Sequence, residues 1–129
     1  MRAIDTNIVV RFLTADDPAQ AAAARTAIAA GDIFISATVF LESEWVLRSG
    51  YRFPAARVAD GLAGLAGLPG VTVEDPAALS LAIEWMRDGM DFADALHLAK
   101  AEGCSAFLSF DKALAKSAKN RSPVPVIVP

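Results

Sequence analysis

The sequence predicts an α/β protein, specifically a three-layer α/β/α sandwich with a central, mainly parallel sheet. Short apolar segments typical of strands alternate along the whole chain with helical segments. Such alternation favours a parallel sheet, because parallel strands are connected by helices that cover the two faces. The chain has 129 residues, a usual length for one domain. We therefore expect a single domain over residues 1–129.

Capping and turn residues mark the elements in the first half of the chain. Asp5 separates a short apolar strand from a helical run, a position typical of a helix cap and also of a site residue at a strand end. Asp17 followed by Pro18 predicts a helix start, and Gly31 predicts a helix stop. The expected strands are 1–4, 32–35 and 71–73, and the expected helices are 8–13, 18–31, 38–49 and one that begins at Pro54.

The helix expected at 38–49 carries two acidic residues with different predicted settings. Glu44 stands four residues before Arg48, the favoured order for an ion pair on a helix surface. Glu42 shares a helix face with apolar residues such as Trp45, so we expect it to point toward the core. A buried carboxylate without a partner is costly. Glu42 is therefore the stronger candidate for binding a cation or a metal.

The second half of the chain predicts a strand followed by an acid for a second time. Asp111 follows a strand at 106–110, as Asp5 follows the first strand. Asp91 is placed as the N-cap of a helix, with Asp94 three residues later in the same turn and His97 one turn further on. A lone His in an apolar helix is more often packed than metal-bound. The remaining expected elements are a helix at 76–89, a basic helix after Asp111 and an edge strand at 124–128.

The apolar character of the chain suggests an oligomer or a protein partner. Hydrophobic residues make up 54% of the chain and the mean hydropathy is +0.39. Leu62, Leu65 and Leu68 recur in a helix that also contains three glycines. These leucines fit the core or a partner surface, and we expect them to meet a partner.

Composition excludes several classes of site. Cys104 is the only cysteine and His97 the only histidine, so zinc sites built from Cys and His and a disulfide framework are excluded. Any metal must then have oxygen ligands, which favours Mg²⁺ or Mn²⁺. No apolar run approaches the ~20 residues of a membrane helix, and no signal-peptide pattern is visible. We therefore expect a cytoplasmic protein without a membrane span.

The charge distribution indicates a basic edge. The net charge is −3, yet residues 100–121 contain five basic and two acidic residues. A basic segment beside an acidic body fits a phosphate-binding edge next to a metal site, with Lys112 and Lys116 as RNA-binding candidates. A solvated helix face is the alternative interpretation.

Four acids are expected to converge in this fold. Asp5 and Asp111 follow strands whose carboxyl ends lie along one edge of the sheet, and Glu42 and Asp94 lie on helices with inward-facing acids. Crowded carboxylates need compensating charge. Two Mg²⁺ ions supply it and make the clamp used for in-line phosphodiester cleavage. The constellation therefore predicts a nuclease.

The ordered motifs resemble those of a known family. The sequences DTN, a Glu in an apolar helix, DFADALHLA and LSFDKAL follow one another as in PIN-domain ribonucleases, specifically VapC-type toxins of toxin–antitoxin pairs. By this resemblance Asp5, Glu42, Asp94 and Asp111 match the family's acidic residues. Thr6, Asn7 and Ser109 match positions that support these acids, and Asp91 is an additional acid. The resemblance implies a Mg²⁺- or Mn²⁺-dependent endoribonuclease, a homodimer and inhibition by a VapB-like antitoxin.

Two other functions were weighed against this one. A phospho-acceptor receiver domain needs an acid pair after its first strand, whereas Asp5 stands alone. A non-catalytic RNA- or protein-binding adaptor on the same fold is the stronger alternative, because a fold does not determine a function. The presence of all four acids speaks against the adaptor.

Overall fold

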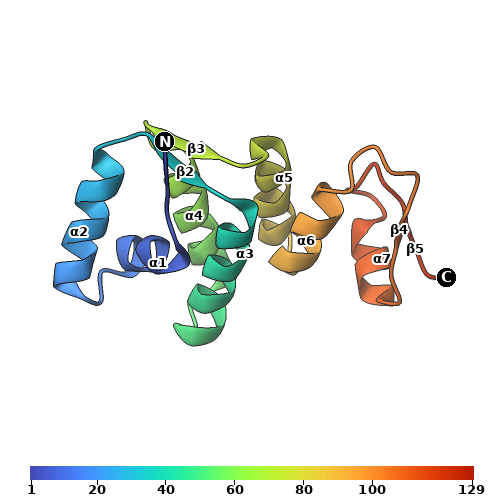
Figure 1. Cartoon of the computed structure of the whole chain (residues 1–129). Helices are drawn as coiled ribbons and strands as arrows, with labels where there is room; N and C mark the ends of the chain where they lie inside the picture. Colours follow the sequence, from blue (N-terminus) through green and yellow to red (C-terminus); the bar gives the residue numbers. More distant parts are fainter. The chain divides into compact units, whose positions relative to one another are not determined.

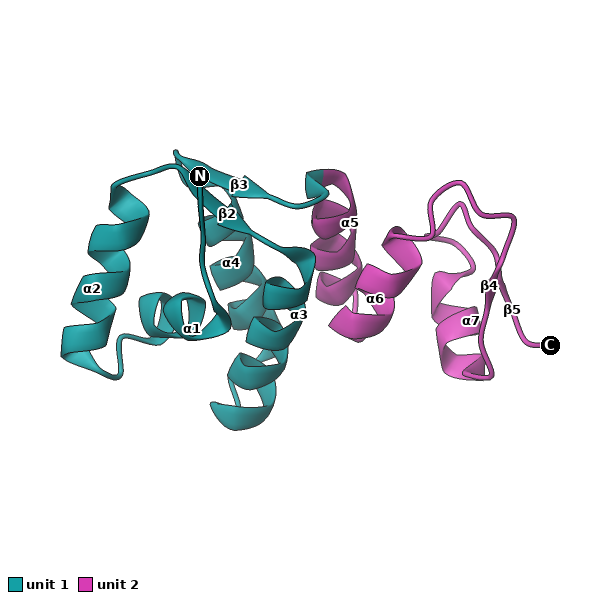
Figure 2. Ribbon diagram, in the orientation of Figure 1, with its two compact units in different colours: residues 1–76 teal, residues 77–129 magenta.

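The computed structural model describes all residues of the chain, 1–129, and divides into two compact units (Figure 2). Unit 1 comprises Met1–Pro76 and unit 2 comprises Ala77–Pro129. Figure 1 shows that helices and short strands follow one another in both units. No helix combines the length and the apolar character needed to span a membrane.

The strands of unit 1 form a parallel sheet in the order β1-β2-β3, with β1 at Arg2–Ala3, β2 at Ile33–Ile35 and β3 at Val71–Val73. Two glycines allow the approach to β2 and β3, with φ angles of +78° at Gly31 and +79° at Gly70. A Cβ on Gly70 would lie 2.8 Å from the Cα of Gly31, closer than atoms pack. The close approach of the segments that lead into β2 and β3 therefore requires glycine at position 70.

The helices of unit 1 begin largely where the sequence predicts. The Asp17 carboxylate accepts a hydrogen bond from the Gln20 N–H at 3.1 Å, and the Ser36 hydroxyl accepts one from the Val39 N–H at 3.3 Å. Both are N-caps that satisfy otherwise unpaired amides. The helices are α1 (Thr6–Thr14), α2 (Pro18–Ala29), α3 (Ala37–Trp45), the π-helical turn η1 (Val46–Gly50) and α4 (Ala55–Ala66).

The two acids of α3 have the opposite settings to those predicted. Glu44 is 1% exposed and pairs with Arg48 Nε at 2.8 Å, so the predicted ion pair is confirmed but its surface position is wrong. Glu42 is exposed, as is Trp45 at 60%. The buried stripe of α3 runs through Phe40, one turn before Glu44. The inward orientation predicted for Glu42 is therefore wrong.

Two of the three leucines that were expected to meet a partner lie in the core of unit 1. Leu62 is 0% exposed and Leu65 is 1% exposed, while Leu68 is partly exposed. Leu62 and Leu65 follow Val58 at helical spacing, and this face of α4 packs toward α3 and β3. The partner surface predicted for Leu62 and Leu65 is thus wrong, because the sheet and α3 already bury this face.

Unit 2 contains a two-stranded parallel sheet and three helices. The sheet pairs β4 (Phe107–Leu108) with β5 (Val126–Ile127), and α7 packs beside β5 through buried Leu114 and Ala118. One face of α5, which includes Leu79 and Met86, is apolar and buried. The helices are α5 (Pro76–Arg87), α6 (Phe92–Ala99) and α7 (Lys112–Ala118). All strand pairs of the chain are parallel, as predicted.

Candidate functional site

Unit 1 joins two of the predicted acids through a single threonine. Asp5 ends the segment after β1 and caps α1, where its Oδ1 accepts a hydrogen bond from the Thr6 N–H at 2.7 Å. The Thr6 hydroxyl donates to Glu42 Oε1 on α3. Thr6 is only 6% exposed, whereas Asp5 and Glu42 are exposed. The packing of α1 against α3 thus places two carboxylates on either side of one buried side chain.

Each of these two carboxylates has a second oxygen that takes no part in the contacts with Thr6. Asp5 accepts through Oδ1 and Glu42 through Oε1. A carboxylate has two oxygens and about four lone-pair sites, so capping or accepting from Thr6 does not exhaust it. Both acids therefore keep acceptor capacity for a cation. Asn7, the other predicted supporting residue here, is exposed in the first turn of α1.

Unit 2 holds the other acids around the start of α6. Asp91 caps α6, and its Oδ2 accepts a hydrogen bond from the Asp94 N–H at 3.1 Å. Partial burial raises the pKa of Asp94 above its usual value of 3.8, and the negative charges of Asp91 and Asp111 raise it further. The nearby His97, which is exposed, acts in the opposite direction. Asp94 thus lies where negative charge is crowded, and a bound cation would relieve this.

Asp111 is positioned by the turn that leads from β4 into α7. Its Oδ1 accepts from the Leu114 N–H at 3.0 Å, which caps α7. Its own N–H donates to Ser109 Oγ at 3.0 Å. The motif resemblance implies a supporting role for Ser109. In the structure Ser109 contacts the backbone N–H of Asp111. Within unit 2 the negative charge of Asp111 contributes to the raised pKa of Asp94, so the two acids interact electrostatically.

The predicted site residues thus fall into two local groups. Unit 1 brings together Asp5 and Glu42, and unit 2 brings together Asp94 and Asp111, with Asp91 beside Asp94. No three His, Cys, Asp or Glu side chains come together as a metal-binding group in the structure. The convergence of all four acids on one metal centre stays a prediction.

The donor chemistry of both groups fits a hard divalent cation. Every candidate ligand is a carboxylate, and oxygen ligands suit Mg²⁺ and Mn²⁺. Partial burial and the negative charges of Asp91 and Asp111 together raise the pKa of Asp94. The residues present therefore fit such a cation by their chemistry.

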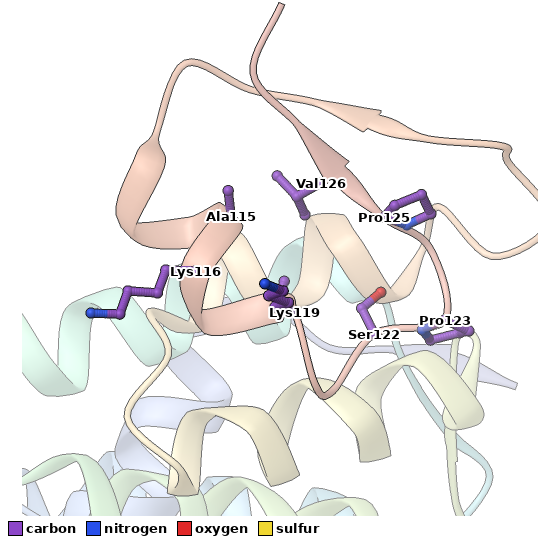
Figure 3. Close-up of a pocket in the computed structure, with 8 residues that line it drawn as sticks. Ala115, Lys116, Lys119, Ser122, Pro123, Pro125 and Val126 are labelled. Atoms are coloured by element: carbon purple, nitrogen blue, oxygen red, sulfur yellow. The ribbon is translucent and has the colours of Figure 1, made fainter.

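Sequence reasoning missed two features near these acids. The first feature is the hydrogen bond from the buried Thr6 hydroxyl to Glu42. The sequence implies only that Thr6 supports the acids in general, because this bond depends on packing between α1 and α3. The second feature is a cavity in unit 2 that includes Lys116, one of the two predicted RNA-binding lysines, and also Lys119 (Figure 3). Lys112 and Lys116 are both exposed on α7, but Lys112 does not line this cavity.

Comparison with known families gives one match. The family model described as PIN domain matches residues 3–120, which includes all four predicted acids and spans both compact units. No curated protein and no solved structure matches the chain significantly. The match covers most of the chain, and it confirms the predicted fold class, the three-layer α/β/α sandwich of this family.

Proposed function

This chain belongs to the PIN domain family, and from that premise we propose that it is a Mg²⁺- or Mn²⁺-dependent endoribonuclease that acts as the toxin of a toxin–antitoxin pair. PIN domains are generally metal-dependent nucleases, usually with divalent metals such as Mg²⁺, and PIN nucleases bind RNA. The specific activity on RNA and the toxin role are supported by the resemblance of the ordered motifs to VapC-type toxins.

The observation that carries the proposal is the pair of acids held by Thr6. Capping of α1 explains why Asp5 accepts a hydrogen bond from Thr6. It does not explain the hydrogen bond to Glu42, which lies on a different helix. The buried Thr6 nevertheless donates to Glu42 and so fixes the orientation of an exposed carboxylate. A hydrogen-bonded neighbour that orients a carboxylate is typical of metal ligands.

The proposed roles follow from the chemistry of each side chain. Asp5, Glu42, Asp94 and Asp111 hold the cations, Thr6 orients Glu42, and the turn at Ser109 positions Asp111. When bound, two such cations supply activation of a water nucleophile and stabilisation of the leaving oxygen in an in-line hydrolysis.

The exposed lysines of α7 bind the substrate in this proposal. Lys112 and Lys116 offset the negative charge of the phosphates that approach Asp111. The residues of this chain therefore bind and orient the substrate, and no histidine base is required. Asn7 and Asp91 stay candidate supporting residues, placed in the first turn of α1 and at the cap of α6.

The test is cleavage of end-labelled single-stranded RNA by the full chain, with Mg²⁺ or with EDTA. We expect Asp5→Asn and Asp94→Asn each to lower the rate by about 100-fold or more, because loss of even an outer partner costs 10–100-fold. Asp32→Asn is the matched control, because the Asp32 carboxylate is exposed, forms an ion pair with the N-terminus and belongs to neither group of acids. Its φ of +58° is one that Asn tolerates.

Two results would overturn the proposal. One is wild-type cleavage by Asp5→Asn and Asp94→Asn proteins whose cooperative thermal melts show that they are folded. The other is a calorimetric titration without binding of Mg²⁺ or Mn²⁺, which would favour the non-catalytic adaptor. The toxin role further predicts that expression of the wild-type chain, but not of the Asp5→Asn variant, arrests growth.

We also propose a VapB-like antitoxin as the inhibitor and a homodimer as the assembly. Both follow from the motif resemblance. The burial of Leu62 and Leu65 means that the surface for either partner has to lie elsewhere on the chain.

A further inference from the structure

The cavity that includes Lys116 and Lys119 lies wholly within unit 2. Its volume is about 520 Å³, within the range of small-molecule sites. The second half of α7, the segment after it and β5 form its walls. In Figure 3, Lys116 lies at one end of the labelled residues and Pro123 and Pro125 lie at the other, with Lys119 and Ser122 between them.

The wall formed by residues 119–125 is held in place at both ends. At one end, the Arg121 and Ser122 N–H groups both donate to the Ala118 carbonyl at 3.0 Å. At the other end, the Pro125 carbonyl accepts from the Phe107 N–H of β4 at 2.9 Å. Two prolines stiffen the segment between these points. Hydrogen bonds within the chain thus hold this wall in place, which reduces the entropy cost of binding.

The polar groups of the cavity suit an anion. Lys116 and Lys119 are exposed cations, and no carboxylate side chain lines the cavity. The hydroxyl of Ser122 accepts a hydrogen bond from the Val124 N–H at 3.1 Å, so its own O–H remains available to donate. In Figure 3 the Lys116 side chain extends away from Ser122 and the prolines, whereas Lys119 lies beside Ser122. The Lys119 ammonium and the Ser122 hydroxyl are therefore the donors for phosphate oxygens here, with Lys116 adding positive charge at the outer end.

The apolar walls add a second requirement. Pro123, Pro125 and Val126 offer flat or compact apolar surfaces beside these donors. A free phosphate would use the donors and leave the apolar surface bare. A nucleotide uses both, because its phosphate meets Lys119 while its ribose and base remove the apolar surface of the prolines from water.

We infer that this cavity is a subsite for one nucleotide of single-stranded RNA, held through its phosphate by Lys119, with Lys116 at the outer end of the cavity. The inference rests on the proposed function and extends it. Asp111 caps the start of α7, and the cavity is lined by the helix from Ala115 to Lys119, so it lies about 6–12 Å along the helix from that acid, at 1.5 Å per residue. A strand whose scissile phosphate lies near Asp111 therefore reaches the cavity with a neighbouring nucleotide.

The test is RNA binding without cleavage. Fluorescence anisotropy of a labelled single-stranded RNA is measured with the full chain in EDTA over a series of salt concentrations. We expect Lys119→Ala to weaken binding about tenfold and to reduce the magnitude of the slope of log K against log salt by ~0.7, the value for one lost phosphate contact. Arg25→Ala, a loss of an exposed charge on α2 of unit 1, is the matched control and should change neither quantity.

A second variant separates the cavity from its charge. Ala115→Leu fills part of the cavity and leaves both lysines in place. It should weaken RNA binding several-fold without changing the salt slope. A phosphate attraction that needs no cavity would leave the affinity of this variant unchanged, and that result would overturn the inference.

Two further outcomes would also overturn it. One is wild-type affinity and salt slope for Lys119→Ala. The other is a Lys119→Ala variant that loses binding to a labelled acidic peptide in the same assay but keeps its binding to RNA. That result would make the cavity a protein site. Because binding is measured in EDTA, a wild-type chain that binds RNA normally but never cleaves it would refute the proposed nuclease and leave the subsite standing.

Discussion

The contact between Thr6 and Glu42 gives the sharpest test of the site. Thr6→Val removes the hydroxyl that donates to Glu42 and retains the shape of a side chain that is 6% exposed. The Thr6 N–H still donates to Asp5, so the cap of α1 is preserved. The variant therefore changes the orientation of one carboxylate and little else. Thr6→Ser, which keeps the hydroxyl, is its control.

The structure sets different magnitudes for stability and for activity. A hydrogen bond to a charged group contributes about 1.5–3 kcal/mol, but Glu42 is exposed, so water replaces much of what is lost. We therefore expect the free energy of unfolding to fall by about 1 kcal/mol, which lowers the melting temperature by roughly 4 °C. Loss of a side chain that orients a metal ligand costs about 10–100-fold in metal affinity or activity.

The assay is a Mg²⁺ titration of the cleavage rate, accompanied by thermal melts of the same samples. Thr6→Val should need at least about tenfold more Mg²⁺ for its half-maximal rate, as the 10–100-fold range predicts, and Thr6→Ser should resemble the wild type. An unchanged Mg²⁺ dependence in a folded Thr6→Val protein would refute the role assigned to Glu42. A large loss of melting temperature in both variants would instead show that Thr6 acts through packing.

Two other predictions concern charge. Arg48→Ala leaves the buried Glu44 without the partner that lies 2.8 Å away, so the free energy of unfolding measured in urea should fall by about 3 kcal/mol. Part of this loss should be recovered when Glu44→Gln is added to Arg48→Ala, and no recovery would contradict the ion-pair explanation. The raised pKa of Asp94 means that the folded state disfavours its ionised form, so its stabilising contribution is complete below pH 3.8 and is lost as pH rises through the raised value. Metal-free Asp94→Asn should therefore melt above the wild type at about pH 7 and with it at about pH 3, and equal melting temperatures at neutral pH would contradict this.

The helix starts were predictable from the sequence because their causes are local. Asp17, Ser36, Asp91 and Asp111 each accept a hydrogen bond from the N–H three residues later. The distance between an N-cap side chain and this amide is fixed by the helix itself, so no distant residue has to be known. The same local geometry predicted the ion pair between residues four apart on α3.

The burial of individual helix faces was not predictable in the same way. Trp45 looked like a core residue because it is large and apolar, yet it is 60% exposed, while the charged Glu44 is buried. The first residues of α3, 37–41, are small or apolar on every side of the helix. The sequence alone therefore does not show which side of the helix faces the core. The packing of α1 and α4 against α3 selects one of them, and that selection depends on residues far away in the chain.

Capping and metal binding at the acids are compatible interpretations, and this determines which variants test them. Asp5 and Asp111 each accept a capping hydrogen bond through Oδ1, which leaves Oδ2 for another partner. Asn caps a helix about as well as Asp but lacks the negative charge. Asp→Asn therefore removes the proposed ligand and keeps the cap, whereas Asp→Ala removes both and mixes a folding defect with a catalytic one. A comparison of the two substitutions at Asp5 separates the cap from the chemistry, because the melting temperature follows the cap and the cleavage rate follows the charge.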